Sequence, residues 1–343
     1  MQLKAQSAWH TALIRLINRG GLSKADLINS LFKQKAVFRK QAKHLYISKD
    51  LQATIVVQQT KDIEVPFYQG DNEWVKKLIA WLNQIDVEPY LEGAYLHGSL
   101  ANDEEINYSD FDALVILNEK AFESPETLAK VCQNLNQLSK LFYQYDPLQH
   151  HGWFVMTKEM LNDYPITYFP PELFSVSKSL LPDKGMQLKL AYNDPSKAEY
   201  AQAFWVMKKS LKRHLSQELS AFNVYQLKSV ISQFMLLPAL FLQAKNQTAI
   251  DKKQSFLEAP KYFSEAEWEV MDKVSGLRSQ WDYSLNFWQK FWLCHGNYSF
   301  RKWGRRYAPM PKGQIKKIVE EISYLEMLKL IERMEEKLKI EEK

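Results

Sequence analysis

Two aspartates lie one residue apart at the start of an apolar run, within the segment HGSLANDEEINYSDFDALVIL (97–117). The run FDALVIL is apolar and bounded by polar residues, which predicts a strand. Side chains two residues apart on a strand share a face, so Asp110 and Asp112 should converge while Phe111 points into the core. Two carboxylates this close repel each other unless a cation lies between them, and Mg²⁺ prefers such hard oxygen ligands. The pair therefore predicts a metal site.

A Gly-Ser pair precedes the two aspartates and adds a second chemical capability. Gly98 lets the backbone approach a phosphate closely, because glycine has no Cβ. Ser99 and the amides after it are expected at the start of a short helix, where free N–H groups and the helix dipole favour anions. The segment is therefore expected to hold the phosphates of a nucleotide beside a metal ion.

This combination resembles the nucleotidyltransferase superfamily of the polymerase β type. Its signature is a hydrophobic residue with Gly and then Gly or Ser, a short gap, and two acids separated by one apolar residue. The matching residues in this sequence are Gly98, Ser99, Asp110, Phe111 and Asp112. The resemblance is to the minimal nucleotidyltransferases, including the aminoglycoside adenylyltransferase group, and by motif it covers about residues 72–160.

The resemblance implies an α+β catalytic domain followed by a helical bundle. It also implies an Mg-dependent (or Mn-dependent) transfer of an NMP, with ATP favoured as donor, to an acceptor hydroxyl with release of pyrophosphate. A small molecule or a protein is favoured over RNA as acceptor, since the net charge is only +5. In such bundles a Lys or Ser-Lys near a helix start contacts phosphates, so Lys252, Lys253 and Ser255 of DKKQSFLEAP are candidates, with a solvated turn as the alternative.

The sequence departs from the superfamily where a third carboxylate is commonly found on a later strand. The segment YDPLQHHGWFVMT offers His150 and His151 there, with Asp146 a few residues earlier. A histidine can serve as the base for an attacking hydroxyl, and it also ligates Zn or Mn better than Mg. We assign the base to His151 because it is nearer the apolar run. A hydrogen-bonded structural His pair is the alternative reading.

Three function hypotheses follow from this departure. An active nucleotidyltransferase with a His base is the first. The second is a catalytically degenerate fold used as a regulatory or antitoxin-like binding module, and the third is an enzyme that adds nucleotides to RNA or tRNA ends. The catalytic domain is shared across many acceptors, so the motif does not choose among them.

A second feature is the basic segment FRKWGRRYAPMPKG (300–313). Four of its cations interleave with Trp303 and Tyr307, namely Arg301, Lys302, Arg305 and Arg306. Aromatic faces and guanidinium groups can hold a nucleobase or a polyanion. The other interpretation is a charged loop that covers the last helix.

The remaining pattern alternates helices with strands and predicts a mixed sheet backed by helices. Helices are predicted over 7–34 (two of them), 72–85 and 119–143, and strands over 44–67, 90–98, 111–117 and 151–157. After about residue 186 the segments are helical in pattern. The predicted domains are an N-terminal packing region (1–70), a catalytic domain (71–185) and a helical domain (186–343).

The tail, 314–343, is predicted to be a single amphipathic helix with Ile315, Ile318, Ile322 and Leu325 on one face. The sequence leaves open whether it packs on the bundle or forms a homodimer contact. Only two cysteines occur in 343 residues, which fits a reducing compartment. The N-terminus lacks the features of a signal peptide and no membrane span is expected, so a cytoplasmic protein is predicted.

Overall fold

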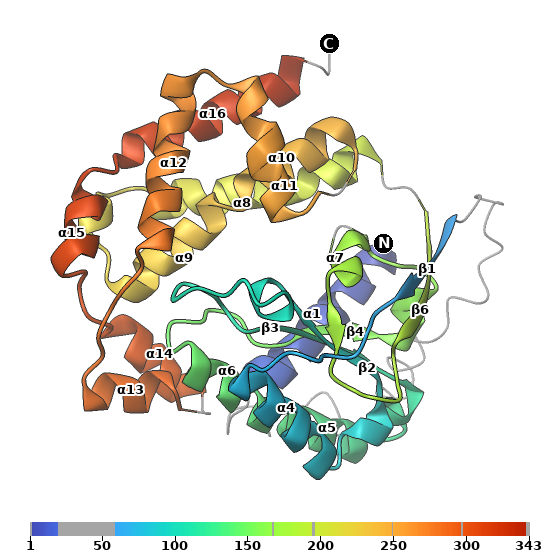
Figure 1. Cartoon of the computed structure of the whole chain (residues 1–343). Helices are drawn as coiled ribbons and strands as arrows, with labels where there is room; N and C mark the ends of the chain where they lie inside the picture. Colours follow the sequence, from blue (N-terminus) through green and yellow to red (C-terminus); the bar gives the residue numbers. More distant parts are fainter. Residues whose placement is uncertain are drawn as a thin grey trace.

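The computed structural model describes residues 2–19, 59–166, 168–193, 196–248, 250–295 and 298–340. This part of the chain is an α+β protein with a small mixed sheet, as the sequence predicts. Figure 1 shows helix-covered strands in its lower right half and a region of helices across its top. The predicted second N-terminal helix, and the predicted strands before residue 59, lie outside the described residues.

The central sheet has four strands in the order β4-β3-β2-β5. Their bounds are β2 Leu91–His97, β3 Asp112–Leu117, β4 Phe154–Thr157 and β5 Lys178–Ser179. β3 pairs antiparallel with β2 and parallel with β4, and the β2–β3 register places His97 opposite Asp112. The turn that follows β2 therefore comes beside the residues that begin β3.

Both faces of this sheet are covered, because the strands are apolar on both sides. Leu96 and Val115 belong to a core shared with four helices, whereas Tyr95 and Leu114 face the opposite core beneath a two-stranded sheet and one short helix. The four helices are α1 Gln2–Arg19, α4 Glu73–Gln84, α5 Pro125–Leu138 and α6 Lys140–Tyr145. The second sheet pairs β1 Gln59–Glu64 with β6 Gln187–Tyr192, and the short helix is α7 Glu172–Ser175.

The helical region follows β6, and most of its helices share one buried core. Its helices are α8 Lys197–His214, α9 Val224–Phe234, α10 Leu237–Asn246, α11 Lys252–Glu258, α12 Glu265–Ser279, α13 Phe287–Leu293, α14 Tyr298–Arg306, α15 Gly313–Glu320 and α16 Tyr324–Ile340. Capping boxes begin α8, α9, α12 and α13, where a Ser or Asn side chain accepts from the third backbone N–H of the helix. Tyr108 and Leu148, from loops of the sheet region, are buried in the same core and join the two regions.

Short 3₁₀ turns connect several of these elements. They are Glu88–Tyr90, Ser99–Ala101, Glu119–Phe122, Lys158–Leu161, Leu219–Ala221 and Ala259–Tyr262. The helix predicted after the Gly-Ser pair is thus a single 3₁₀ turn.

Two predictions about the second half need correction. The single tail helix predicted over 314–343 is wrong, because the chain breaks into α15 and α16 and folds back on α10 and α12. Ile315 and Ile322 are buried on this path, but Leu325 is 52% exposed. The boundary predicted at 185 also falls before β6, which pairs with β1, so the strand-containing part extends to Tyr192.

One helical stretch, Val224–Asn246, is long and apolar enough to cross a membrane by length and composition. Within its most apolar window, 72% is buried inside the protein, which is compatible with a core helix of a soluble protein.

Candidate active site

The two aspartates at the start of β3 are fixed by the residue between them. Phe111 is fully buried, and its ring stacks on Phe142 with centroids 4.7 Å apart. The side-chain amide of Gln149 accepts from the Phe111 N–H at 2.8 Å and donates to the Phe111 carbonyl at 3.0 Å, as a neighbouring strand would. This anchoring leaves Asp110 and Asp112 on the other face, where both reach one histidine, as the strand geometry predicts.

The turn after β2 lies directly against the second aspartate. Gly98 has φ +73° and ψ −159°, a conformation open almost only to glycine. A Cβ on Gly98 would lie 2.7 Å from Oδ2 of Asp112. Ser99 donates from Oγ to Oγ of Ser109 at 2.9 Å, and Ser109 accepts from the N–H of Ile106 at 3.0 Å. The turn and the loop back to β3 therefore form one hydrogen-bonded unit beside the acids.

His151 lies between the two carboxylates as a cation. Its Nε2 is 3.0 Å from Oδ1 of Asp112 and 3.8 Å from Oδ2 of Asp110. Its Nδ1 donates to the carbonyl of Gly152 at 3.1 Å. Burial by itself would lower the pKa of His151, but the hydrogen bonds with Asp110 and Asp112 outweigh it and raise that pKa well above 6.5. These contacts therefore favour the cationic ring, with a proton on each nitrogen.

His150 differs from its neighbour in both charge and contacts. Burial and the charge of His151 lower the pKa of His150 to about 4, so this ring is neutral at pH 7. Its Nδ1 is buried and makes no hydrogen bond to the described residues. Ligand atoms of Asp110, His150 and His151 all lie within 4.8 Å of one another. A carboxylate beside an unpartnered imidazole nitrogen suits a metal ion such as Mn²⁺, and it suits Mg²⁺ less well.

A buried lysine that the sequence reading missed completes the charge arrangement. Lys228 of α9 is fully buried, and its Nζ is 2.8 Å from Oδ1 of Asp110 and 2.7 Å from Oδ2 of Asp146. Burial alone would raise the pKa of Asp110, but the charge of Lys228 and the hydrogen bond with His151 hold it well below its usual range. A signal for this residue was present, since Lys228 is the only charged residue in the apolar stretch 222–244.

Asp146 is the acid that precedes the His pair. It is connected to the acid pair through Lys228. Its Oδ1 accepts from the N–H of Leu148 at 3.1 Å, and Oδ2 meets Lys228. Burial and the negative charge of Asp110 raise the pKa of Asp146 to about 7. The positive charge of Lys228 acts in the opposite direction and lowers it. Lys228 thus links Asp146 to Asp110. The resemblance implies a third carboxylate that binds the metal, whereas Asp146 pairs with a lysine.

Tyr108 fixes this lysine from the sheet region. Its hydroxyl donates to the backbone carbonyl of Lys228 at 2.8 Å and lies 2.8 Å from Oγ of Ser232. The ring of Tyr108 also faces the Lys228 ammonium, with Nζ 4.9 Å from the ring centroid. The loop that carries the acid pair is therefore joined to α9 at two positions.

The residues of DKKQSFLEAP separate into different environments. Lys252 is close enough to the acid pair that both charges act on its pKa, which burial and Arg278 nevertheless lower to about 8. Lys253 is exposed and forms an ion pair with Glu104 at 2.8 Å. Ser255 is buried and donates to the carbonyl of Lys252 at 2.7 Å. Of the three, only Lys252 has a pKa on which the charges of Asp110 and Asp112 act.

The basic segment 300–313 is largely helical, because α14 ends at Arg306, so the charged-loop reading is wrong for its first half. Arg301 is buried, with its guanidinium 3.9 Å from the ring centroid of Tyr143. Arg305 donates to the backbone carbonyl of Gln149 at 3.1 Å, two residues before His151. The segment therefore contacts the His loop directly.

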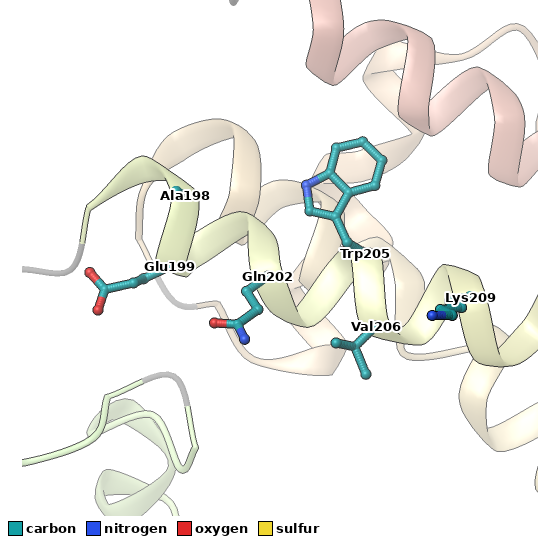
Figure 2. Close-up of a pocket in the computed structure, with 6 residues that line it drawn as sticks. All are labelled: Ala198, Glu199, Gln202, Trp205, Val206 and Lys209. Carbon is teal, nitrogen blue, oxygen red and sulfur yellow. The ribbon is translucent and has the colours of Figure 1, made fainter. Parts of the chain in front are cut away.

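A shallow, open depression of about 390 Å³ lies along α8, and Figure 2 shows its lining. The lining residues are Ala198, Glu199, Gln202, Trp205, Val206 and Lys209. They all lie on one helix and include neither acid of the pair nor the residues around it. This depression is therefore separate from the candidate active site.

Comparisons with family models, with curated proteins and with solved structures found no match to this chain.

Proposed function

We propose that the chain is a nucleotidyltransferase with a polymerase β-like catalytic fold, which moves an NMP, with AMP favoured, from an NTP to an acceptor hydroxyl. The observation that carries the proposal is the contact between the Gly98 turn and Asp112, where a Cβ would lie 2.7 Å from the carboxylate. Backbone without a side chain, placed against an acid pair, is what a site needs to hold phosphates and a divalent ion side by side.

The arrangement of strands supports this proposal. The turn ends β2, the acids begin β3, and these strands are antiparallel neighbours with His97 opposite Asp112. A helical region follows the sheets and supplies Lys228 to Asp110, and the acid pair acts on the pKa of Lys252 in the same region. A sheet region followed by a helical region is also the arrangement expected of the family. A cytoplasmic location is part of the proposal as well.

In the proposed site Asp110 and Asp112 would hold a divalent ion, and His150, whose ligand atom lies near that of Asp110, would be an additional ligand for Mn²⁺. The bound ion would supply neutralisation of the phosphate charge. The turn at Gly98 and Ser99 offers backbone amides to the phosphates, and Lys252 offers a cation. An acceptor oxygen bonds to the α-phosphorus, the bond from that phosphorus to the bridging oxygen breaks, and pyrophosphate leaves.

The acceptor proton needs a base that is neutral before the reaction. The contacts with Asp110 and Asp112 raise the pKa of His151 and favour its protonated form, so it can act as base only after it has lost that proton. His150 is already neutral at pH 7, which makes it the alternative base if it is not a metal ligand. The sequence favours His151 as the base because it lies nearer the apolar run. The lowered pKa of His150 makes that residue an equally good candidate for the base.

The proposal is tested by the double change Asp110→Asn and Asp112→Asn. Calorimetric titration with ATP and the other NTPs, with Mg²⁺ or Mn²⁺, should show metal-dependent binding that weakens at least about tenfold in the variant. Pyrophosphate release should be lost as well. The matched control is Asp62→Asn with Glu64→Gln, two exposed acids at the same spacing on β1. Unchanged binding and turnover in the site variant would refute the assignment.

A second candidate function, a degenerate nucleotide-binding or regulatory module, is favoured by one observation. Lys228 and His151 already neutralise much of the charge of the acid pair without any metal. Such a module should bind an NTP without metal dependence and release no pyrophosphate over a broad acceptor panel. The same titration distinguishes it, because an active enzyme needs the divalent ion for tight binding.

A further inference from the structure

Five aromatic rings on α13, on its neighbour α14 and at Tyr307 directly after α14 are exposed to solvent. The exposed fractions are 74% for Phe287, 66% for Trp288, 45% for Phe291, 50% for Trp303 and 55% for Tyr307. Large aromatic side chains are usually buried, and a contiguous exposed group of them marks an interaction site. We call these five side chains, with the exposed cations Lys290, Lys302 and Arg306, the aromatic–basic surface.

The rings form one continuous row and are not scattered. Trp288 and Phe291 have centroids 6.3 Å apart, and Phe291 and Phe300 are 6.4 Å apart. Trp292 connects Phe300, at 6.3 Å, to Trp303, at 6.1 Å. Trp303 stacks on Tyr307 at 5.7 Å with an interplanar angle of 14°. The row therefore runs along both helices and offers several exposed ring faces in succession.

The charge of this part of the chain is of one sign. Residues 283–319 contain eight Lys or Arg and no Asp or Glu, whereas the whole chain has 45 cations and 40 acids. Lys290, Lys302 and Arg306 of the surface are exposed. An exposed aromatic row among cations without acids complements a polyanion that carries stackable rings.

The aromatic–basic surface is also joined to the candidate active site. Arg305 of α14 donates to the Gln149 carbonyl at 3.1 Å, and the Gln149 amide holds both Phe111 and the His151 carbonyl. Asn223, the N-cap of α9, donates to the carbonyl of Arg305 at 3.0 Å. Figure 1 shows α14 near α6, and the guanidinium of Arg301 in α14 lies 3.9 Å from the ring centroid of Tyr143 in α6. Helix α14 therefore links the two: its Arg305 contacts the loop that carries His151, while its Lys302 and Trp303 face solvent.

We propose that the aromatic–basic surface binds single-stranded nucleic acid and presents its 3′-terminal hydroxyl to the acid pair as the acceptor. This rests on the proposed nucleotidyltransferase function and names its substrate class. Bases stack on the exposed rings while the cations meet phosphates, a mode that tolerates many sequences. In the transfer, the 3′ oxygen bonds to the α-phosphorus of the NTP, pyrophosphate leaves, and the hydroxyl proton passes to a histidine of the site.

A membrane surface also attracts aromatic and basic side chains, but it gives no reason for the contact with the His loop. The earlier preference for a small molecule or protein acceptor came from the net charge of +5, which averages over the chain. Residues 283–319 contain no acid, and this local charge favours a nucleic acid as the acceptor.

Binding is measured first, without NTP or metal, by fluorescence anisotropy with 5′-labelled single-stranded RNA and DNA of about 12 nucleotides. Trp288→Ala with Trp303→Ala should weaken binding by about tenfold or more, since each lost stacking contact is large. Lys302→Gln with Arg306→Gln should reduce the slope of log Kd against log salt by about one per lost phosphate contact. Because the lysine and arginine are exposed, this second variant is expected to fold.

The matched control is Val206→Ala with Lys209→Gln, an exposed apolar residue and a cation on α8 away from the site. It should bind like the wild type. Failure of both surface variants to weaken binding, or binding only to vesicles of phosphatidylserine and phosphatidylcholine, would overturn the proposal.

Transfer is measured second, with radiolabelled NTPs and oligonucleotides that end in a 3′-hydroxyl or a 3′-phosphate. Only the 3′-hydroxyl should be extended, and the surface variants should raise KM with kcat nearly unchanged. Oligonucleotide binding without any transfer would refute the catalytic proposal and the presentation of the 3′ end together. Transfer to another acceptor with no oligonucleotide binding would refute this inference alone.

Discussion

Asp110 sits in a cluster where three carboxylates share two cations. Lys228 contacts Asp110 and Asp146, and His151 contacts Asp110 and Asp112. With every acid ionised, the cluster is one positive charge short of neutrality. A divalent ion would more than correct this and leave the site attractive to phosphates. The same inventory explains why Asp146, the most buried partner of the lysine, has its pKa raised to about 7.

Removal of the lysine charge is therefore expected to be costly. Lys228→Met leaves Asp110 and Asp146 buried without their shared cation, and loss of one partner of a buried ion pair typically destabilises by about 3–5 kcal/mol. Urea unfolding followed by circular dichroism in the presence of a chelator measures the change.

Lys253→Met is the matched control, because its ion pair with Glu104 is exposed. Exposed pairs contribute about 1 kcal/mol or less. Equal losses in the two variants would contradict the view that the lysine of α9 compensates buried acids.

Among the elements, the turn between β2 and the 3₁₀ turn Ser99–Ala101 needs a glycine for its backbone conformation. Gly98 combines φ +73° with ψ −159°, and its missing Cβ leaves room for the carboxylate of Asp112. The turn is held in place because β2 and β3 pair through His97 and Asp112. The absence of a Cβ at Gly98 therefore allows both the backbone conformation of the turn and its close approach to Asp112.

Gly98→Ala should lower the free energy of unfolding by about 1–3 kcal/mol, because an L side chain is strained in this backbone conformation. It should also weaken NTP binding. Gly276→Ala, in the interior of α12 with no atom within 4 Å of the added Cβ, is the control.

The control should be more stable than the wild type by up to about 1 kcal/mol, since alanine favours helix. Chemical denaturation of the two variants gives the comparison. A destabilised Gly276→Ala alongside an unaffected Gly98→Ala would reverse this assignment.

For the whole molecule, contacts between distant parts of the chain hold the sheet and the site together. The N-terminal α1 covers one sheet face, and His10 places Nε2 2.6 Å from the carbonyl oxygen of Val155 in β4. Asn18 of the same helix donates to the carbonyl of Trp153 at 2.7 Å and accepts from Arg301 of α14 at its own carbonyl, at 3.1 Å. The first and last thirds of the chain thus meet at Asn18, beside the residue that precedes β4.

The His10 contact predicts a pH dependence of stability. Burial lowers the pKa of His10 below 6.5, so the unfolded chain takes up the proton first and folding is weakened as the pH falls below 6.5. His10→Gln should cost about 1 kcal/mol at pH 7.5 through the altered hydrogen bond. The difference between wild type and variant should shrink as the pH is lowered to 5.

Urea denaturation of both proteins at several pH values checks this. A wild-type advantage that grows on acidification would mean that His10 is stabilised as a cation, against this account.

Much of the site could be predicted from the sequence, because it depends on local geometry. The alternation of a strand places Asp110 and Asp112 on one face and Phe111 in the core, whatever the rest of the chain does. Glycine before a strand-to-strand return marks the turn at Gly98. The helix over 72–85 and the strands β2, β3 and β4 also follow from periodicity, whereas the two-residue β5 was not predicted. The tail helix was predicted less well, because local periodicity does not show where the chain folds back on the bundle.

The sequence by itself determined the acid pair, the small-residue turn and the alternation of helices and strands, since each is set by backbone geometry over a few residues. Only the tertiary structure decided that Lys228 joins Asp110 to Asp146, across 82 residues in the second case, and that His151 is a cation between the two acids. It also decided that α14 rests on the His loop through Arg305. These contacts depend on how distant elements pack, and the charge of a buried group is set by its neighbours in space.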